Sequence, residues 1–139
     1  VILTVIAGTA YGKRSPVDVF SPTLYVDAQL ADGAVLEVPD EHVQRACYVA
    51  QGRIEIAGQA YGEGQFMVFA SAAGPVSMRA LETARVMLAG GAPLDGPRHI
   101  EWNFVSSTRE RIEVARRDWR KRRFASVPRD AERIPLPDE

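Results

Sequence analysis

Residues 90–112 read GGAPLDGPRHIEWNFVSSTRERI, and the pattern of the chain changes within this stretch. Before it, apolar side chains recur at every second position, which is typical of β-strands. After it, apolar side chains recur at helical spacing. Glycine and proline, which interrupt regular structure, lie between the two patterns. The sequence therefore predicts a β-rich body, a short connection and one helix.

The β-rich body covers residues 1–89. Its alternation is clearest in residues 24–30, LYVDAQL, where one face would carry Leu24, Val26, Ala28 and Leu30. Turn signals such as Gln51-Gly52 and Gly62-Glu63-Gly64 separate the short apolar runs. Many short strands at this spacing indicate a β-sandwich or a jelly-roll barrel.

The helix is predicted from about Thr108 to about Arg123, because Ser107 and Glu110 have the spacing of a capping box. Its apolar stripe, which we expect to face the barrel, comprises Ile112, Ala115 and Trp119. We expect Phe124 to fold back on the helix. We assign residues 1–105 to the barrel and residues 106–139 to a helix and an extended tail packed on it, in one domain.

The composition describes an ordinary soluble chain of 139 residues, 46% apolar and 25% charged. A net charge of −1 does not favour nucleic acid or an anionic membrane. The single cysteine, Cys47, excludes an internal disulfide and fits a reducing compartment, so we expect a cytoplasmic protein. No apolar run reaches the roughly 20 residues of a transmembrane helix. Because the chain lacks an initiator Met, we interpret it as a domain that is either excised from a longer protein or encoded alone.

Several segments together resemble the C-terminal half of the pirin family: Arg14-Ser15-Pro16-Val17, Ser21–Asp27, Tyr48-Val49 with Gly52, Pro97–Ser107, Arg109–Ile112, Asp118–Arg120, Arg123-Phe124 and Ile134–Pro137. Pirins have two cupin barrels in tandem. The resemblance implies an all-β fold, a cupin-type double-stranded β-helix (jelly-roll) barrel with one C-terminal α-helix. The family's metal, such as Fe, lies in the first barrel beside a His-Pro-His pattern that this chain lacks.

A cupin binds its metal through histidines and a glutamate, a donor set suited to transition metals. In the cupin motif the glutamate stands seven residues before a turn glycine, and counting back from Gly52 leads to Arg45. The histidine positions fall at Pro39, Glu41 and Met67. Arginine repels a cation and keeps its proton. We therefore expect neither a metal cofactor nor a catalytic residue in this chain.

Arg45 itself has two interpretations. It could anchor an anion in a pocket inside the barrel, with Tyr48, Tyr61 or Met67 as neighbours. It could instead be a surface arginine on the outer face of the sheet, which we favour because an unpaired buried charge is costly. We expect Cys47 to be a small buried side chain, His42 to lie in a loop at the rim, and His99 to be structural or exposed.

The helix carries many arginines, and its basic end forms a candidate partner surface of Arg116, Arg120, Arg123 and Trp119. The alternative, which we favour, is a solvated face with acidic residues between the basic ones. Nucleic-acid binding is not expected.

Pirins include metal-dependent quercetin 2,3-dioxygenases and transcription cofactors, and both roles depend on the metal-bearing barrel. We therefore expect this chain to be a structural or interaction half, without enzymatic activity of its own, whose partner is a second cupin barrel or another copy. A parent enzyme would be a quercetinase-like dioxygenase. The alternative is a metal-free cupin that binds a small molecule inside the barrel.

Overall fold

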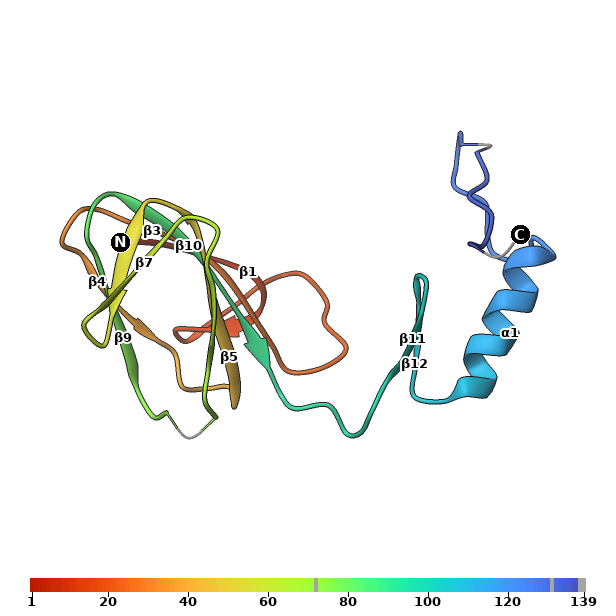
Figure 1. Ribbon diagram of the computed structural model, residues 1–139, viewed down its shortest axis with the longest axis horizontal. Helices are drawn as coiled ribbons and strands as arrows, with labels where there is room; N and C mark the ends of the chain where they lie inside the picture. Colours follow the sequence, from red (N-terminus) through yellow and green to blue (C-terminus); the bar gives the residue numbers. More distant parts are fainter. Residues whose placement is uncertain (72, 131, 138–139) are drawn as a thin grey trace. The chain divides into compact units, whose positions relative to one another are not determined.

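The computed structural model describes residues 1–71, 73–130 and 132–137. The chain divides into two compact units, residues 1–93 and residues 94–139. The first unit contains β1 to β10, and the second contains β11, β12 and α1 (Figure 1). The elements are β1 (Ile2–Ala10), β2 (Lys13–Arg14), β3 (Thr23–Leu30), β4 (Val35–Val38), β5 (Gln44–Gln51), β6 (Arg53–Ile56), β7 (Gln59–Gly62), β8 (Phe66–Phe69), β9 (Val76–Ala80), β10 (Ala84–Gly91), β11 (His99–Glu101), β12 (Phe104–Ser106) and α1 (Arg109–Arg120).

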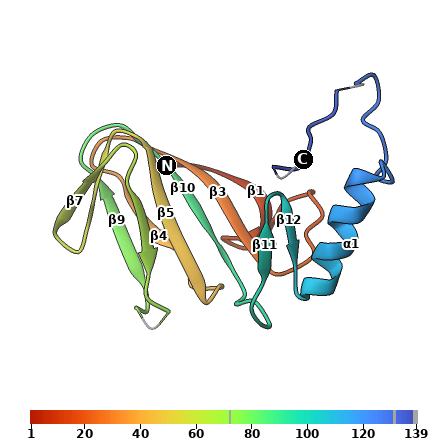
Figure 2. The same cartoon turned by 45° about the vertical axis from the view of Figure 1, so that its right-hand side comes forward.

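The first unit is built from two antiparallel sheets. Six strands form one sheet in the order β2-β1-β3-β10-β5-β8, and four strands form the other in the order β4-β9-β6-β7. Figure 2 shows β1, β3, β10 and β5 side by side in the larger sheet. From β3 to β10 the chain passes repeatedly between the two sheets, as in a jelly roll. The predicted all-β architecture with a single C-terminal helix is confirmed.

The core of this unit lies between the two sheets. The face predicted for residues 24–30 is confirmed, because Leu24, Val26, Ala28 and Leu30 are each at most 1% exposed. Val86 and Leu88 of β10 lie beside them, and the smaller sheet contributes Ile54 and Met78. Each buried aliphatic side chain of this size contributes about 1.5–3 kcal/mol to folding.

The turn between β5 and β6 depends on Gly52. Its φ is +77°, and a Cβ there would lie 2.4 Å from the carbonyl oxygen of Thr83. A side chain at this position would be strained and would collide with the backbone. Gly52 therefore occupies a turn, as expected for the turn glycine of the cupin motif from which Arg45 was located.

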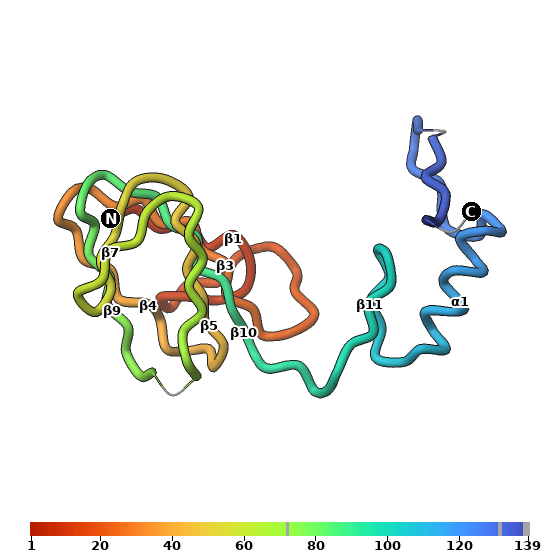
Figure 3. The backbone as a smooth tube through the Cα atoms, viewed as in Figure 1, coloured from red at the N-terminus to blue at the C-terminus, as the bar shows by residue number. Residues whose placement is uncertain are grey.

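The second unit consists of the β11–β12 hairpin, α1 and the segment that follows, whose path Figure 3 traces. The predicted capping box at Ser107 is wrong by one residue, because Thr108 is the N-cap and its hydroxyl accepts a hydrogen bond from the Arg111 N–H at 3.4 Å. The helix also ends at Arg120, before the predicted Arg123.

The early end of α1 has a local cause. Arg122 adopts a left-handed φ of +52°, its N–H donates to the carbonyl of Trp119, and the N–H of Arg123 donates to the carbonyl of Asp118. These two bonds form a Schellman motif. The left-handed position of a Schellman motif usually holds glycine. Because Arg122 occupies it here, the sequence did not indicate that the helix ends at Arg120.

The sequence assigns residues 94–105 to the barrel, whereas the structure groups them with the helix. The reason is that β11 pairs with β12 and both contact α1. The apolar stripe of α1 faces this hairpin through Trp119, and packing of the second unit on the barrel stays a prediction.

Within the described ranges, no helix has the length and hydropathy needed to cross a membrane.

Candidate functional site

Arg45 lies on the inner face of β5. Arg45, Cys47 and Val49 alternate along the strand, and all three are buried; Arg45 is 4% exposed. On β10, Gly90 stands opposite Arg45 and Leu88 stands opposite Cys47. A Cβ at Gly90 would lie 2.1 Å from the carbonyl oxygen of Gln44, so the strands approach closely there. The interpretation of Arg45 as an outer-face arginine is wrong.

The guanidinium of Arg45 joins the two sheets. Its Nη2 donates to the carbonyl oxygen of Gly74 at 2.8 Å, and its Nη1 makes a weaker contact of 3.5 Å with that of Pro39. Pro39 follows β4 and Gly74 precedes β9, two strands that pair at Val38 and Val76. Arg45 therefore spans from the larger sheet to one end of the smaller sheet.

Among the described residues, the charge of Arg45 has no acidic partner. Across the described part of the chain, no carboxylate lies within 4.0 Å of the guanidinium, and its buried Nε has no hydrogen-bond partner. Carbonyl dipoles alone offset the positive charge. A buried guanidinium with an unused N–H is a costly arrangement and a feature that an anionic ligand would relieve.

The positions that correspond to a cupin metal site do not fit a transition metal. Arg45 is a cation, Pro39 has no side-chain donor, Glu41 is exposed, and Met67 offers a thioether. Among the residues that the structure describes, no group of three His, Cys, Asp or Glu side chains is placed to hold a metal ion.

The other residues predicted to line a pocket with Arg45 lie on different faces and strands. Met67 pairs with Cys47 and packs against the core, on the same face as Arg45. Tyr48 lies on the opposite face, where it is 39% exposed, so it does not join Arg45. Tyr61 of β7 packs against the core from the smaller sheet. The strand alternation, which places Tyr48 between two inward residues, accounts for its position.

Two further side chains, His42 and Tyr11, add polar groups within this unit. His42 lies in a loop as predicted but is 7% exposed, and its Nε2 is 3.1 Å from the carbonyl oxygen of Thr9. The Tyr11 hydroxyl donates to the carbonyl of Glu37 at 2.7 Å. Burial, with added repulsion from Glu37 and Glu41, raises the pKa of Tyr11 to about 12. The sequence analysis missed Tyr11, which follows β1 in a turn with only the neighbouring Gly12 as a signal.

Cys47 is confirmed as a buried side chain, with none of its surface exposed. Burial raises the pKa of its thiol to about 12. It is therefore a protonated thiol at neutral pH and a poor nucleophile.

A groove of about 410 Å³ opens beside Arg45 at the ends of β5, β8 and β10. Its lining includes the polar residues Gln44, Arg45 and Ser71 and the apolar residues Val68 and Phe69. Arg45 is the one cationic side chain among the described residues that line it. Ala46, Val68 and Ala89 of this lining lie on the outer face of the larger sheet, whereas the guanidinium of Arg45 lies on the inner face.

The outer face of the larger sheet carries an apolar surface, which we call the outer patch: Tyr25, Tyr48, Phe66, Val68 and Met87. The register places Tyr48 opposite both Met87 of β10 and Phe66 of β8. Phe66 is 60% exposed and Val68 is 74% exposed, and both lie on the edge strand β8. Contiguous exposed apolar side chains of this kind mark interaction surfaces, and an edge strand adds unpaired backbone groups.

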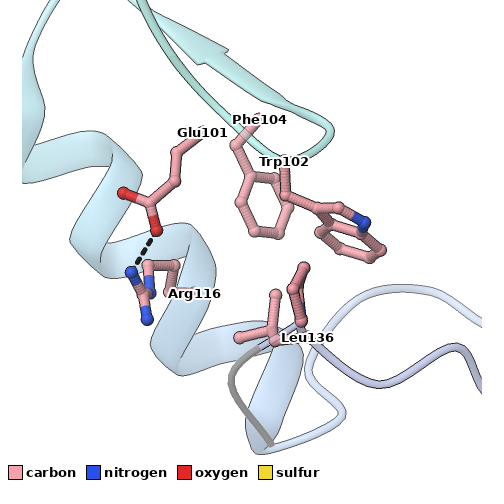
Figure 4. A pocket seen from close by; sticks show the side chains of 6 residues that line it. Glu101, Trp102, Phe104, Arg116 and Leu136 are labelled. Atoms are coloured by element: carbon pink, nitrogen blue, oxygen red, sulfur yellow. Dashed lines mark hydrogen bonds and ion pairs between the residues drawn. The ribbon is translucent and has the colours of Figure 1, made fainter.

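The candidate partner surface on the helix is largely used within the chain. Arg116 forms an ion pair with Glu101, shown as a dashed line in Figure 4. Arg123 pairs with Asp118 at 3.2 Å, and Arg120 also makes an interaction within the structure. His99 is half-buried in β11. Arg116, Arg120 and Arg123 each therefore make an interaction within the chain, and their role as a partner surface stays a prediction.

Trp119 is the centre of an aromatic cluster in the second unit. Its ring centroid lies 5.2 Å from that of Trp102 and 5.5 Å from that of Phe124, which folds back as predicted. The indole N–H donates to the carbonyl of Ile134 at 2.8 Å. A cavity of about 190 Å³ beside the cluster is lined by Glu101, Trp102, Phe104, Arg116, Leu136 and Pro137 (Figure 4). The role of Trp119 in this geometry is packing of the hairpin and the tail.

Comparison with known proteins supports the fold and the resemblance. Residues 25–125 match the family described as Pirin C-terminal cupin domain. A pirin-like protein of Caulobacter vibrioides is 47% identical over 134 residues, which cover 96% of this chain and 46% of that protein. Two crystal structures of quercetin 2,3-dioxygenase from Acinetobacter baumannii have the same fold. Their TM-scores are 0.82 and 0.83 at 22% and 24% identity, and the matches cover 90% and 97% of this chain and 44% and 46% of theirs.

The chain spans about half the length of the curated relatives that it matches. The family match covers most of the chain and includes β5. The chain therefore belongs to the pirin family and has the fold of that family's C-terminal cupin domain.

Proposed function

We propose that this chain is the barrel without a metal site in a two-barrel pirin, a structural and interaction half that supports a metal-bearing cupin barrel. The observation that carries the proposal is Arg45, a buried cation in the position where a cupin presents a carboxylate. A fixed positive charge there opposes binding of a metal cation. Any quercetin 2,3-dioxygenase-like activity would then belong to the longer, cytoplasmic protein, with its metal, such as Fe, in the other barrel.

The outer patch supplies the contact surface in this proposal. Phe66 and Val68 project from β8 on the side away from the core, next to Tyr48. Relatives about twice as long as this chain favour a second cupin barrel as the occupant of the patch. Burying such side chains contributes about 25 cal/mol for each Å² of apolar surface removed from water. A second copy of the chain would be an alternative occupant.

Metal analysis tests the division of roles. We expect the purified 139-residue chain to contain a negligible molar fraction of Fe, Mn, Ni or Cu, before and after incubation with each ion. We expect the parent two-barrel protein to contain about one metal ion per molecule. Stoichiometric metal in the chain alone would contradict the proposal.

Binding between the two barrels tests the outer patch. We expect the separately produced metal-bearing barrel to bind this chain, and the double variant Phe66→Ser, Val68→Ser to weaken binding by at least about tenfold. Val35→Ser on β4, an exposed apolar position on the other sheet, is the matched control and should leave binding unchanged. Equal effects of both changes would contradict a role for the outer patch.

A further inference from the structure

We propose that the second unit contains a peptide-binding groove, formed by the β11–β12 hairpin and α1, which recognises an extended segment with a leucine between two prolines. The chain's own residues 134–137, Ile-Pro-Leu-Pro, fill this groove, so the tail is a peptide bound within the same chain. When the tail leaves, the groove binds a segment of the same kind from another protein. This site is separate from the outer patch and does not depend on the proposed function.

The first support is the way in which the tail is attached. Every described residue from 121 to 135 is exposed, and Leu136 is then 3% exposed. Phe124 contacts the aromatic cluster from this segment but is itself 48% exposed. Residues 132–136 belong to no helix or strand. One buried side chain at the end of an exposed connection is how a tethered peptide contacts its site, since a core strand buries alternate residues.

The second support is the geometry of the contact. The Trp119 indole N–H donates to the carbonyl oxygen of Ile134 at 2.8 Å, and the proline that follows restricts Ile134 to an extended backbone. Two positions further on, Leu136 lines the same cavity as Trp102 and Phe104 (Figure 4). Aromatic-lined grooves bind proline-rich segments in this manner, because proline sets the extended backbone in advance and lowers the entropy lost on binding.

The third support is the room that the tail leaves in the groove. The cavity beside Leu136 has a volume of about 190 Å³, and its other walls include the ion-paired side chains of Glu101 and Arg116. The leucine therefore does not fill the space between the hairpin and α1. A segment with a larger apolar side chain at this position would bury more surface and bind more tightly.

The tether determines how the site can be observed. A tail held close to its groove by a short connection competes at an effective concentration in the millimolar range. An external segment therefore gains access most easily when the anchor of the tail is weakened. The Leu136→Ser variant of the full chain weakens the anchor and leaves the residues of the hairpin and α1 unchanged.

The test follows the Trp119 indole N–H by NMR in the ¹⁵N-labelled 139-residue chain. In Leu136→Ser we expect this signal to move toward that of a solvent-exposed indole. A synthetic peptide with the sequence of residues 132–137 should return it saturably to the parent position. The same peptide with serine in place of leucine should bind at least about tenfold more weakly, and the peptide with phenylalanine there should bind more tightly. Val127→Ser, at a 65% exposed position before the tail, is the matched control and should keep the parent signal.

The parent chain gives a second test that does not depend on the fold of the variant. The phenylalanine peptide, added in excess at several millimolar, should displace the tail and shift the methyl signals of Leu136. The proposal is overturned by the absence of this displacement, by equal binding of the leucine and serine peptides, or by a parent-like indole signal in Leu136→Ser without peptide. A parent chain that is a dimer by light scattering and loses its dimer in Leu136→Ser would also overturn it, because the tail would then fill the groove of a second copy.

Discussion

The Nη2 of Arg45 donates a 2.8 Å hydrogen bond to the carbonyl oxygen of Gly74, which lies 29 residues further along the chain. This bond connects β5 of the larger sheet to the segment that leads into β9 of the smaller sheet. A buried charge thus serves as a cross-link between the two sheets. The relationship has consequences for stability that are independent of any ligand.

Arg45→Ala should lower the free energy of unfolding by about 2–3 kcal/mol, because it leaves two carbonyls without a donor and opens a cavity. Arg45→Met should cost less, since its side chain keeps much of the aliphatic packing. Urea unfolding followed by circular dichroism measures both values. Arg53→Ala, at an exposed arginine, should stay within about 0.5 kcal/mol of the parent chain. An unchanged stability of Arg45→Ala would refute the cross-link.

The ion pair of Asp27 and Arg85 predicts an acid-dependent loss of stability. Arg85 donates Nε to Oδ1 at 2.9 Å and Nη2 to Oδ2 at 2.7 Å. These hydrogen bonds, helped by the charge of Arg85 and opposed by burial, lower the pKa of Asp27 below its usual 3.8. Because the folded pKa is the lower one, the carboxylate adds stability above the unfolded pKa, and this contribution disappears as pH falls through the folded value.

Thermal unfolding between about pH 5 and pH 2 checks this sign. The Asp27→Asn variant should be less stable than the parent chain at neutral pH, and the difference should shrink as the solution is acidified. Asp32→Asn, at an exposed turn position, serves as the control and should preserve the parent's pH profile. A pH-independent difference for Asp27→Asn would contradict the linkage.

Arg122→Gly should stabilise the chain by about 1 kcal/mol, because glycine adopts the left-handed conformation of the Schellman motif without the strain of a side chain. The melting temperature from calorimetry measures the gain. Arg117→Gly removes an arginine from inside the helix and should instead destabilise it by about 1 kcal/mol. If both variants lose stability, Arg122 has a role beyond the left-handed cap.

Cys47 should resist thiol reagents in the folded chain. Its thiol has no exposed surface, and burial raises its pKa to about 12. At about pH 8, Ellman's reagent should modify it only as fast as the chain unfolds, and fully in concentrated guanidinium chloride. Rapid modification under native conditions would mean that this part of the core opens readily.

The sequence alone predicted the elements that depend on local pattern. Alternation in residues 24–30 identified the core face, and residues 90–112 located the change from strands to helix. The ends of the helix were less accurate, because Thr108 competes with Ser107 as the cap and an arginine occupies the position usual for glycine. Hairpin pairing of residues 99–106 was not expected, since those strands are only three residues each.

The site depended on information that the sequence contains only in part. Both faces of β5 carry apolar or long side chains within residues 45–49. The alternation of residue types therefore did not reveal which of the two faces points into the core. Cys47 is expected to be buried, and side chains alternate along a strand. Arg45 and Val49 must then share the inner face with Cys47, and Tyr48 must lie on the outer face. That step assigns the face of Arg45, but it does not identify the partners of its guanidinium.

The sequence by itself determined the family, the β-rich body and the single helix. These follow from residue types and spacings, which are properties of a linear chain. Only the tertiary structure decided that Arg45 is buried, that it joins Gly74 to the larger sheet with no acidic partner among the described residues, and that Arg116 pairs with Glu101 and Arg123 with Asp118. Those facts depend on strand register and on loops distant in sequence, because the groups that contact a charge buried between two sheets come from segments far apart in the chain.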